Sequence, residues 1–326
     1  VRRGLAELNR SERPGITALI AQAGMRAGTV DSTAIAFRLG PRINAAGRLA
    51  HAKLAYRLLR TPDPAEAYTL AAELEDLNDA RRTMTDAAQI EAEPQVQAQM
   101  EADASVLVVR SPALRSGIVG LVAGKLAERF YRPAVVIEEG EEFARGSARS
   151  IEEFNITQAL DGLSEMLVRY GGHSRAAGFT IAAENLPHFE IRLREIADEQ
   201  LPNLRELRPT LAIDAEVPLD QLNWGLREQF ARLEPLGSAN PAPLLKTRAR
   251  LRDVRTVGKG KHLRLVVDDG PATPVLDAVA FQQGERSRVL ETDMLVDLVF
   301  HLDVNEYQGR QSLQLNVQDM RAAGDS

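Results

Sequence analysis

The feature that most constrains the fold of this chain is residues 64–100, a long stretch almost free of helix-breaking residues. The stretch is rich in Ala, Glu, Asp, Gln and Arg, and Leu70, Leu74 and Leu77 recur at helical spacing. Such a pattern predicts one extended helix, because apolar residues three and four apart share a helical face. We expect this helix to connect two folded parts, of which the first is residues 1–63, compact and helical in pattern.

The apolar pattern changes after the predicted helix. SVLVVR (105–110) and PAVVIEE (133–139) are typical of buried strands, and GIVGLVAGKLAERF (117–130) between them predicts a helix. A strand–helix–strand unit predicts two parallel strands joined by a right-handed crossover. Residues 101–205 are therefore expected to form an α/β domain.

The second half of this domain is expected to alternate between helix and strand. We predict a helix from about Asn155 to Tyr170, then the strand GFTIA (178–182), and a last helix over residues 185–200. The stretch GGH, residues 171–173, would then lie between a helix and a strand.

Residues 206–326 are rich in strand-like runs with alternating apolar and polar residues. Five short strands in such a module suggest a small barrel, and the OB-fold is the commonest barrel that binds nucleic acids. The predicted fold class is thus α/β followed by β. The five runs are KTRARLRDVRTV (246–257), KHLRLVVDD (261–269), VLDAVAFQ (275–282), MLVDLVFHLDVNEY (294–307) and SLQLNVQDM (312–320).

The composition excludes several kinds of protein. The chain has no Cys, so disulfides and thiolate metal sites are ruled out, which fits a reducing, cytoplasmic location. No apolar run reaches the ~18 residues of a membrane span, so no membrane association is expected. We found no spacing typical of a hydrolytic metal site, and we expect no metal ligands in this chain. The chain begins at Val1 within a helical pattern, which indicates a fragment of a longer protein.

The charge is unevenly distributed. The net charge is −6, yet eight basic residues and one acidic residue lie between Lys246 and Arg264, a local charge of +7. A single positive stretch in an acidic chain suggests a localised contact with a polyanion. The alternative is a solvated strand face.

Basic residues alternate along the first strand of the predicted barrel. Arg248, Arg250 and Arg252 should project from one face, since successive strand residues point to opposite sides. With Lys259, Lys261 and Arg264 on the next segment, they would form a groove that follows a nucleic-acid backbone. The nearest aromatic residues for base stacking are Phe281 and Tyr307, so this binding is expected to be electrostatic rather than sequence-specific.

The stretch YGGHSRAAGF (170–179) combines three glycines with a histidine. Gly171 and Gly172 would let a ligand approach the backbone closely. His173 could donate to a phosphate or carry a proton near neutral pH. The alternative is a close-packed turn with a solvated histidine.

A second candidate site is GSARS (146–150). Ser147 and Arg149 lie two residues apart, so they share a face of an extended backbone and could clamp a phosphate. Ser150 could instead cap the next helix.

A third candidate is GPRINAAGRLA (40–50), where Arg42, Asn44 and Arg48 stand among small residues. Such a stretch suits a close contact with a partner surface or a polyanion. It could equally be the start of a helix that runs on to Leu59.

Segments throughout the chain resemble the RecJ family, the single-stranded-DNA-specific 5′-to-3′ exonucleases of the DHH phosphoesterase superfamily. The resemblance covers nearly the whole chain, and GGHSRAAGF is typical of the DHH-associated domain in general. The segments are RPGITAL, PRINAAGRL, LEDLNDARR, SGIVGLVAGKLAERFYRPAVVI, GSARSIEEFNITQAL, GGHSRAAGF, EPLGSANPAPLL, VGKGKHLRLVV and GRQSLQLNVQD.

The resemblance implies a division into domains. Residues 1–63 would be the end of a DHH domain, 64–100 a long connecting helix, 101–205 the DHH-associated domain and 206–326 an OB-fold that holds single-stranded DNA. The family's metal motifs, which bind Mn²⁺ or Mg²⁺ in the full-length enzyme, precede the point where this chain starts. The fragment alone is therefore expected to be inactive and to bind no metal, because two-metal hydrolysis needs both ions.

The resemblance also implies roles for the candidate residues. Ser147 and Arg149 would bind the 5′-terminal phosphate, His173 and the glycines before it would line the cleft near the metals, and Arg42 would contact the substrate. Arg115 stands in a Leu-Arg-Ser segment where the family commonly has Trp-His-Pro.

The implied activity is exonuclease action in DNA repair and recombination. The implied partners are single-stranded DNA, a single-strand-binding protein and a helicase, with the protein acting as a monomer. One alternative is a nuclease-inactive DNA-binding or scaffolding member of the superfamily. Another is a phosphoesterase for short oligonucleotides or cyclic dinucleotides, although the barrel argues against so small a substrate.

Overall fold

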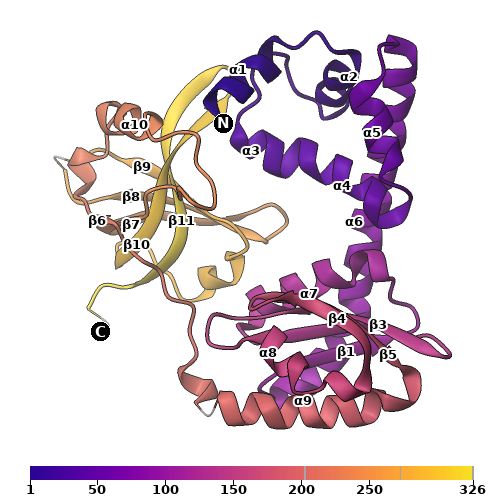
Figure 1. The fold of residues 1–326 in the computed structure, drawn as a ribbon. Coiled ribbons are helices and arrows are strands. Elements are labelled where there is room, and N and C mark those ends of the chain that lie inside the picture. The colour runs from indigo at the N-terminus through magenta and orange to yellow at the C-terminus, as the bar shows by residue number, and fades with distance from the viewer. Residues whose placement is uncertain (202, 272, 325–326) are drawn as a thin grey trace. The chain divides into compact units, whose positions relative to one another are not determined.

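The computed structural model describes residues 1–201, 203–271 and 273–324, and it divides into two units (Figure 1). The first unit is Val1–Pro209 and the second is Thr210–Ser326. The first combines helices with a mixed sheet, and the second is a closed β-barrel. This agrees with the predicted fold class.

Short helices build the start of the first unit. They pack around an apolar core that includes Leu19, Leu58 and Leu74. Gly15 allows a close approach, because a Cβ at this position would collide with the carbonyl of Leu58. The helices are α1 (Arg2–Arg10), α2 (Pro14–Gln22), α3 (Ser32–Ala34), a π-helical turn (Ile35–Leu39), α4 (Gly40–Leu49) and α5 (Lys53–Arg60).

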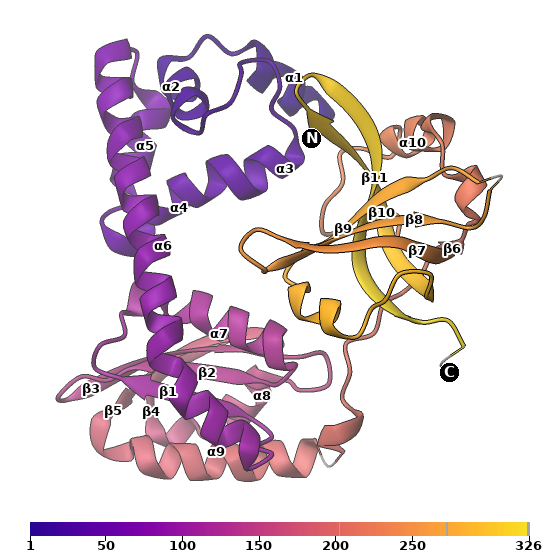
Figure 2. The same cartoon turned by 180° about the vertical axis from the view of Figure 1, so that it is seen from behind.

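The long helix α6 (Pro64–Glu101) confirms the prediction of an extended connecting helix. It starts where the Asp63 side chain accepts a hydrogen bond from the Ala65 N–H at 2.9 Å, with Pro64 at the first helical position. Its first half packs on α2, α4 and α5, and its second half packs on the sheet and on α7 (Ser116–Phe130) (Figure 2).

Two glutamines on α6 pair with the edge of the sheet. The Gln99 side chain donates to the Val108 carbonyl at 2.8 Å and accepts from the Val108 N–H at 2.9 Å. Gln95 makes the same two bonds with Arg110, at 2.9 and 3.2 Å. These side-chain amides take the place of a neighbouring strand, so the sheet edge has its backbone groups satisfied.

The sheet of the first unit has five strands in the order β1-β2-β3-β5-β4. β1 and β2 are parallel, as predicted for the strand–helix–strand unit, and the other neighbours are antiparallel. The strands are β1 (Leu107–Ser111), β2 (Ala134–Glu138), β3 (Phe143–Arg149), β4 (Leu167–His173) and β5 (Ala176–Ala182).

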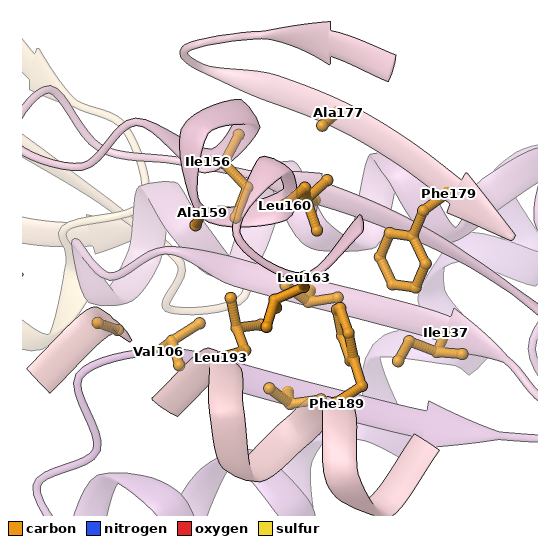
Figure 3. Close-up of a cluster of buried hydrophobic side chains, with 14 of the residues drawn as sticks. Val106, Ile137, Ile156, Ala159, Leu160, Leu163, Ala177, Phe179, Phe189 and Leu193 are labelled. Carbon is orange, nitrogen blue, oxygen red and sulfur yellow. The ribbon is translucent and has the colours of Figure 1, made fainter. Parts of the chain in front are cut away.

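One face of this sheet carries the largest apolar cluster of the unit. Helices α8 (Ile156–Asp161) and α9 (Leu186–Gln200) cover it, and the rings of Phe179 and Phe189 lie 4.9 Å apart at its centre (Figure 3). Helices α6 and α7 pack on the opposite face against residues of β1 and β2. α9 confirms the helix predicted over residues 185–200.

The helix predicted from Asn155 to Tyr170 is wrong in its second half. α8 ends at Asp161, with Gly162 as its C-terminal cap, and the chain enters β4 at Leu167. Glycine is poor inside a helix and common just after one, so Gly162 ends this helix. The GGH stretch therefore belongs to a strand at the edge of the sheet.

The second unit closes into a barrel because β7 pairs with both β8 and β10. All five predicted strands are present. The apolar residues on their inner faces form one core around Leu265, Leu298 and Phe300. The elements are β6 (Ala215–Glu216), α10 (Trp224–Ala231), β7 (Leu245–Val257), β8 (His262–Asp268), β9 (Leu276–Ala280), β10 (Leu295–Tyr307) and β11 (Arg310–Ala322).

Among the described residues, no helix combines the length and apolar character needed to span a membrane.

Candidate nucleic-acid interface

The face of β3, β5 and β4 that carries Ser147 forms an open shelf. The strand register places three cross-strand rows on this face, since directly paired residues point to the same side. None of the nine residues is acidic. The rows are Arg149–Ala176–His173, Ser147–Gly178–Gly171 and Arg145–Thr180–Arg169.

The centre of the shelf is bare backbone. Gly171 and Gly178 are exposed, and a Cβ built on Gly171 would meet nothing within 4 Å. An extended ligand could therefore lie directly on these two strands. Gly171 is thus accessible, and its role in the close approach of a ligand stays a prediction.

Gly172 has a different reason to be glycine. A Cβ at this position would collide with the Ala176 carbonyl and would lie 2.8 Å from the Ala177 Cβ. Gly172 points to the packed side of the hairpin, so its role in the fold is packing within β4 and β5. The expected role of Gly172 in ligand approach has no support in this arrangement.

Ser147 and Arg149 lie together at one side of the shelf. The Arg149 guanidinium donates to the Ser147 hydroxyl at 3.2 Å and to the Ala148 carbonyl at 2.8 Å. Gly120 on α7 faces them, and a Cβ there would lie 3.0 Å from Ser147 Oγ and 3.2 Å from Arg149 Nη2. The glycine leaves room for the pair, which offers a hydroxyl and a guanidinium to one anion.

A pocket beside this pair gathers further arginines. It lies between α6, α7 and β3. Its charged lining consists of four basic residues, Arg81, Arg82, Lys125 and Arg149, and two acidic residues, Asp86 and Glu128. Burial lowers the pKa of Arg149, and the positive charge of Arg48 lowers it further. The pKa of Arg81 is lowered by burial first and then by Arg82 and Arg48. These mutually repelling cations would be stabilised by a bound anion.

Arg81 was not among the residues predicted from the sequence. It donates to the Asn78 side chain at 3.0 Å, and its Nε atom is buried without a hydrogen-bond partner. It lies within LEDLNDARR, one of the segments that carry the resemblance, but one helical turn after Asn78 its spacing alone did not indicate that it would reach the pocket.

Arg42, Asn44 and Arg48 do not act as one group. Arg42 is 8% exposed, and its guanidinium forms a two-bond ion pair with Glu75 and donates to the Arg38 carbonyl at 2.6 Å. This burial argues against the substrate contact that the resemblance implies for Arg42. Asn44 is exposed.

Arg48 is exposed and lies where α4 meets α7. It donates to the Gly117 carbonyl at 3.3 Å, and a Cβ on Gly117 would collide with the Arg48 carbonyl. Arg115 is exposed just before α7 and provides no side-chain cap for the helix.

Ser150 and His173 differ in their access to solvent. The Ser150 hydroxyl is buried and donates to the Phe154 carbonyl at 2.6 Å, so it stabilises the loop before α8. Asn155, and not Ser150, caps that helix. His173 is exposed at the end of β4, in the same row as Arg149.

The arginines of β7 in the second unit are engaged with carboxylates. Arg248 pairs with Asp297 at 3.1 Å, and Arg252 pairs with Asp268 at 2.6 Å and with Asp293 at 3.0 Å. The expected outward alternation is present, because the intervening Ala249 is buried. The local charge of +7 in the sequence is nonetheless offset by acids from neighbouring strands and loops.

The remaining basic residues of this group lie elsewhere on the barrel. Arg250 donates to the Asp293 carbonyl at 3.1 Å, and Arg264 on β8 pairs with Asp277 at 2.7 Å. Lys259 and Lys261 are exposed in the turn between β7 and β8. The six residues therefore do not form one continuous cationic groove.

A separate pocket of the second unit opens on β8, β9, β10 and β11. It contains Arg264 from the predicted set, Tyr307, which is 69% exposed, and Arg310. Arg310 was missed because it stands alone in the sequence, far from the basic stretch. The full lining is Arg264, Asp277, Asn305, Tyr307, Gln308, Arg310, Ser312 and Gln314. In OB-folds this face, between the first and last hairpin loops, is the usual oligonucleotide site.

Within the parts of the chain that the structure describes, no group of three or more His, Asp or Glu side chains is arranged to hold a metal ion.

Comparisons with known proteins agree with this architecture. Residues 103–199 match the family model of the DHHA1 domain, and residues 213–319 match that of the RecJ OB domain. The chain therefore carries a DHHA1 domain and a RecJ OB domain over these residues. Both assignments agree with the resemblance found in the sequence.

RecJ proteins match almost the whole chain. The single-stranded-DNA-specific exonuclease RecJ of Bacillus subtilis is 36% identical over 97% of this chain and 40% of its own length. That of Dickeya dadantii is 31% identical over 98% of this chain and 57% of its own length. The chain thus spans about half the length of the curated relatives it matches.

The fold matches solved RecJ structures. The crystal structure of RecJ in complex with Mn²⁺ from Thermus thermophilus superposes with a TM-score of 0.83 at 30% identity. The match covers 99% of this chain and 46% of that chain. The same protein in complex with Mg²⁺ gives a TM-score of 0.82.

Proposed function

We propose that this chain is the strand-binding part of a 5′-to-3′ exonuclease that degrades single-stranded DNA. The observation that carries the proposal is the shelf on β3, β5 and β4, where Ser147 and Arg149 border a floor of glycine backbone. A bare floor beside cations suits an extended phosphodiester chain, which needs close contact and charge but no base-specific shape. The RecJ relatives, named as exonucleases of this kind, support the assignment.

The Ser147–Arg149 pair is proposed to hold the 5′-terminal phosphate. A terminal phosphate carries more negative charge than an internal one and presents three oxygens, which a guanidinium and a hydroxyl can share. Arg81 lines the pocket beside Arg149, and the positive charge of Arg48 acts on both arginines, since it lowers the pKa of each. Burial strengthens these electrostatic contacts, because water screens them less.

His173 on β4 lies across the shelf from this pair. It is directly opposite Ala176 on β5, which is in turn directly opposite Arg149 on β3. We propose that it donates a hydrogen bond to the phosphodiester that follows the terminal nucleotide. Its exposure leaves the ring accessible to a phosphate that lies on the shelf. Its function would be to position the scissile phosphate.

Metal ions supply the hydrolytic chemistry in the proposed activity, by activating water and neutralising the phosphate. The Thermus thermophilus structures contain Mn²⁺ or Mg²⁺. The residues described in this chain form no suitable ligand cluster, so they do not fit such ions. The contribution of this chain is to bind the strand, orient its 5′ end and place its first phosphodiester.

The barrel is proposed to bind single-stranded DNA as well. Its pocket offers Arg310 for a phosphate and an exposed Tyr307 for base stacking. We therefore place the DNA on this pocket rather than on the arginine row of β7, whose cations are already paired with carboxylates.

Binding of oligonucleotides with different 5′ ends tests the proposal. EDTA would prevent cleavage, and affinities would be measured by fluorescence anisotropy for strands with a 5′-phosphate or a 5′-hydroxyl. The wild-type chain should prefer the phosphate, and Arg149→Ala should reduce that preference about tenfold or more, because charge-assisted bonds contribute ~1.5–3 kcal/mol. Equal losses on both strands would contradict a terminal-phosphate site.

Arg192→Ala is a matched control for this experiment. Arg192 is exposed on α9 and pairs locally with Glu195, on the opposite side of the sheet from the shelf. This variant should retain the wild-type preference. Release of nucleotides from a 5′ label, but not from a 3′ label, with Mn²⁺ and a protein containing this chain tests the direction of degradation.

A further inference from the structure

The third row of the shelf, Arg145–Thr180–Arg169, has no place in the terminal-phosphate site. Both arginines are exposed and stand on strands β3 and β4, with Thr180 of β5 between them. Arg169 Nε donates to Thr180 Oγ1 at 3.2 Å, which turns its guanidinium over the sheet face. The row therefore presents two cations and a hydroxyl on the side of the sheet where the DNA is proposed to lie.

Neither arginine forms an ion pair among the described residues. Glu138 on the neighbouring strand β2 pairs with Arg145 in the strand register, and its carboxylate accepts a hydrogen bond from the Ser116 N–H at 2.9 Å. The carboxylate of Glu138 is thus hydrogen-bonded to the first residue of α7. By contrast, most arginines on the barrel strands are paired with aspartates. Two unpaired cations on one open face make an anion site more favourable than a structural role.

The distance along the strands fits an extended nucleic acid. Arg145 precedes Arg149 by four residues, and Arg169 precedes His173 by four, so the two cationic rows are about 13 Å apart at ~3.3 Å per residue. The glycine row lies between them. A single strand held at Arg149 and His173 could cross this bare row and place a later phosphate at Arg145 and Arg169.

We propose that Arg145 and Arg169 form a downstream clamp for the phosphate backbone, about two nucleotides beyond the terminal phosphate site. The proposal rests on the proposed function, because it needs the strand to lie on the shelf. The clamp would hold the strand by charge and would not read its bases. It would make short oligonucleotides bind more weakly until they are long enough to reach the third row.

A length series tests the clamp. Affinities of the full chain for 5′-phosphorylated oligonucleotides of one to eight nucleotides would be measured in EDTA. Arg145→Ala and Arg169→Ala should leave mononucleotide binding unchanged and weaken longer strands by roughly threefold to fivefold each, as expected for exposed charge pairs. Each should also reduce the slope of log affinity against log salt by about 0.7 on long strands.

Conservative variants separate charge from folding. Arg145→Lys and Arg169→Lys keep the charge and should retain most of the salt slope, whereas the alanine variants should melt at the wild-type temperature because both side chains are exposed. Arg192→Ala on α9 should match the wild type at every length.

The outcomes distinguish the clamp from the function on which it rests. Suppose that Arg149→Ala weakens binding of every 5′-phosphorylated strand, while Arg145→Ala and Arg169→Ala leave the affinity unchanged at every length. The clamp is then wrong and the proposed function stands. Equal weakening at all lengths, including the mononucleotide, would also overturn the clamp. If the wild-type chain binds no strand at all, the proposed function itself is wrong.

Discussion

Gln99 of α6 and Val108 of β1 exchange two hydrogen bonds, one in each direction, at 2.8 and 2.9 Å. Gln95 repeats the arrangement with Arg110 one helical turn earlier. The long helix is therefore bonded to the sheet by the same pattern that joins two strands. This places α6 in a fixed register with the strand edge, which in turn fixes the side of the pocket that Arg81 lines next to Arg149.

Replacing Gln99 with Leu should destabilise the first unit. The change keeps a side chain of similar size but leaves the N–H and C=O of Val108 without partners, at a cost of about 1–3 kcal/mol. Urea unfolding followed by circular dichroism measures it. Gln97→Leu is the control, because Gln97 is exposed on the same helix and bonds with Glu101 at 3.1 Å. Equal effects of the two changes would mean that the Gln99 bonds contribute nothing.

The elements that depend on local sequence were predictable. The helix over 64–100 was predicted from Leu70, Leu74 and Leu77, and these signals do not depend on the rest of the chain. The barrel strands were predicted for the same reason. The helix that was extended to Tyr170 failed because Gly162 was not weighted as a stop, although glycine at that position commonly ends a helix.

The site was only partly predictable, because it depends on pairing between distant residues. Ser147 and Arg149 were found from their spacing, but the row that joins Ser147 to Gly178 and Gly171 follows from the strand register. The cationic groove predicted from the basic residues of β7 is not formed, for the same reason. Arg248 and Arg252 are neutralised by Asp297 and Asp293, which are 49 and 41 residues away in the sequence. A window of local charge cannot include such partners.

Gly120→Ala should impair the terminal phosphate site without unfolding the protein. The new methyl group would lie 3.0 Å from Ser147 Oγ and 3.2 Å from Arg149 Nη2, so the pair must move. The helix itself should gain up to about 1 kcal/mol, since alanine is the better helix former. The preference for 5′-phosphorylated strands over 5′-hydroxyl strands should shrink several-fold.

Gly124→Ala is the matched control for this change. It lies one turn later on the same face of α7, and its methyl group would be 4.0 Å from Arg149 Cγ, an ordinary contact. It should gain similar stability and keep most of the preference. The interpretation fails if both variants lose the preference equally, or if neither does.

Gly171 and Gly172 should respond differently to alanine. Gly171→Ala adds a methyl group to open space on the shelf, so it should leave the melting temperature nearly unchanged and weaken single-stranded DNA binding. Gly172→Ala forces a methyl group against Ala176 and Ala177, and overpacking of this kind costs about 1–3 kcal/mol. Thermal melts and anisotropy on both variants check this. A destabilised Gly171→Ala with normal binding would show that the shelf is structural.

The pocket on the barrel should contribute more to DNA binding than the arginine row of β7. Arg310→Ala should reduce the salt slope on long single strands by about 0.7, and Tyr307→Ala should weaken binding by about 1–3 kcal/mol through lost stacking. Arg248→Ala should leave the slope unchanged, because Arg248 is paired with Asp297. If Arg248→Ala reduced the salt slope more than Arg310→Ala, the DNA would instead have to lie along β7.

Asp297 should stabilise the barrel in a pH-dependent way. It is 4% exposed and lies within 3.1–3.9 Å of basic groups on Lys246, Arg248 and Arg321. Burial tends to raise the pKa of Asp297, but the hydrogen bond from Arg248 and the charge of Lys246 bring the pKa below its ordinary value. Its stabilisation is therefore fully present above the ordinary Asp pKa of about 3.9 and is lost as the pH falls through the lowered folded-state value.

Asp297→Asn should accordingly cost about 1–3 kcal/mol at pH 7, because the basic groups keep their charge and lose its counterpart. The difference from the wild type should narrow as the pH falls below about 4, where the wild-type carboxylate also becomes neutral. Urea unfolding at pH 7, 5, 4 and 3 gives this difference directly. Asp303→Asn is the control, since Asp303 is exposed and accepts a hydrogen bond from Asn316 at 2.9 Å. A cost that stays constant from pH 7 to pH 3 would show that the loss arises from packing and not from the charge of Asp297.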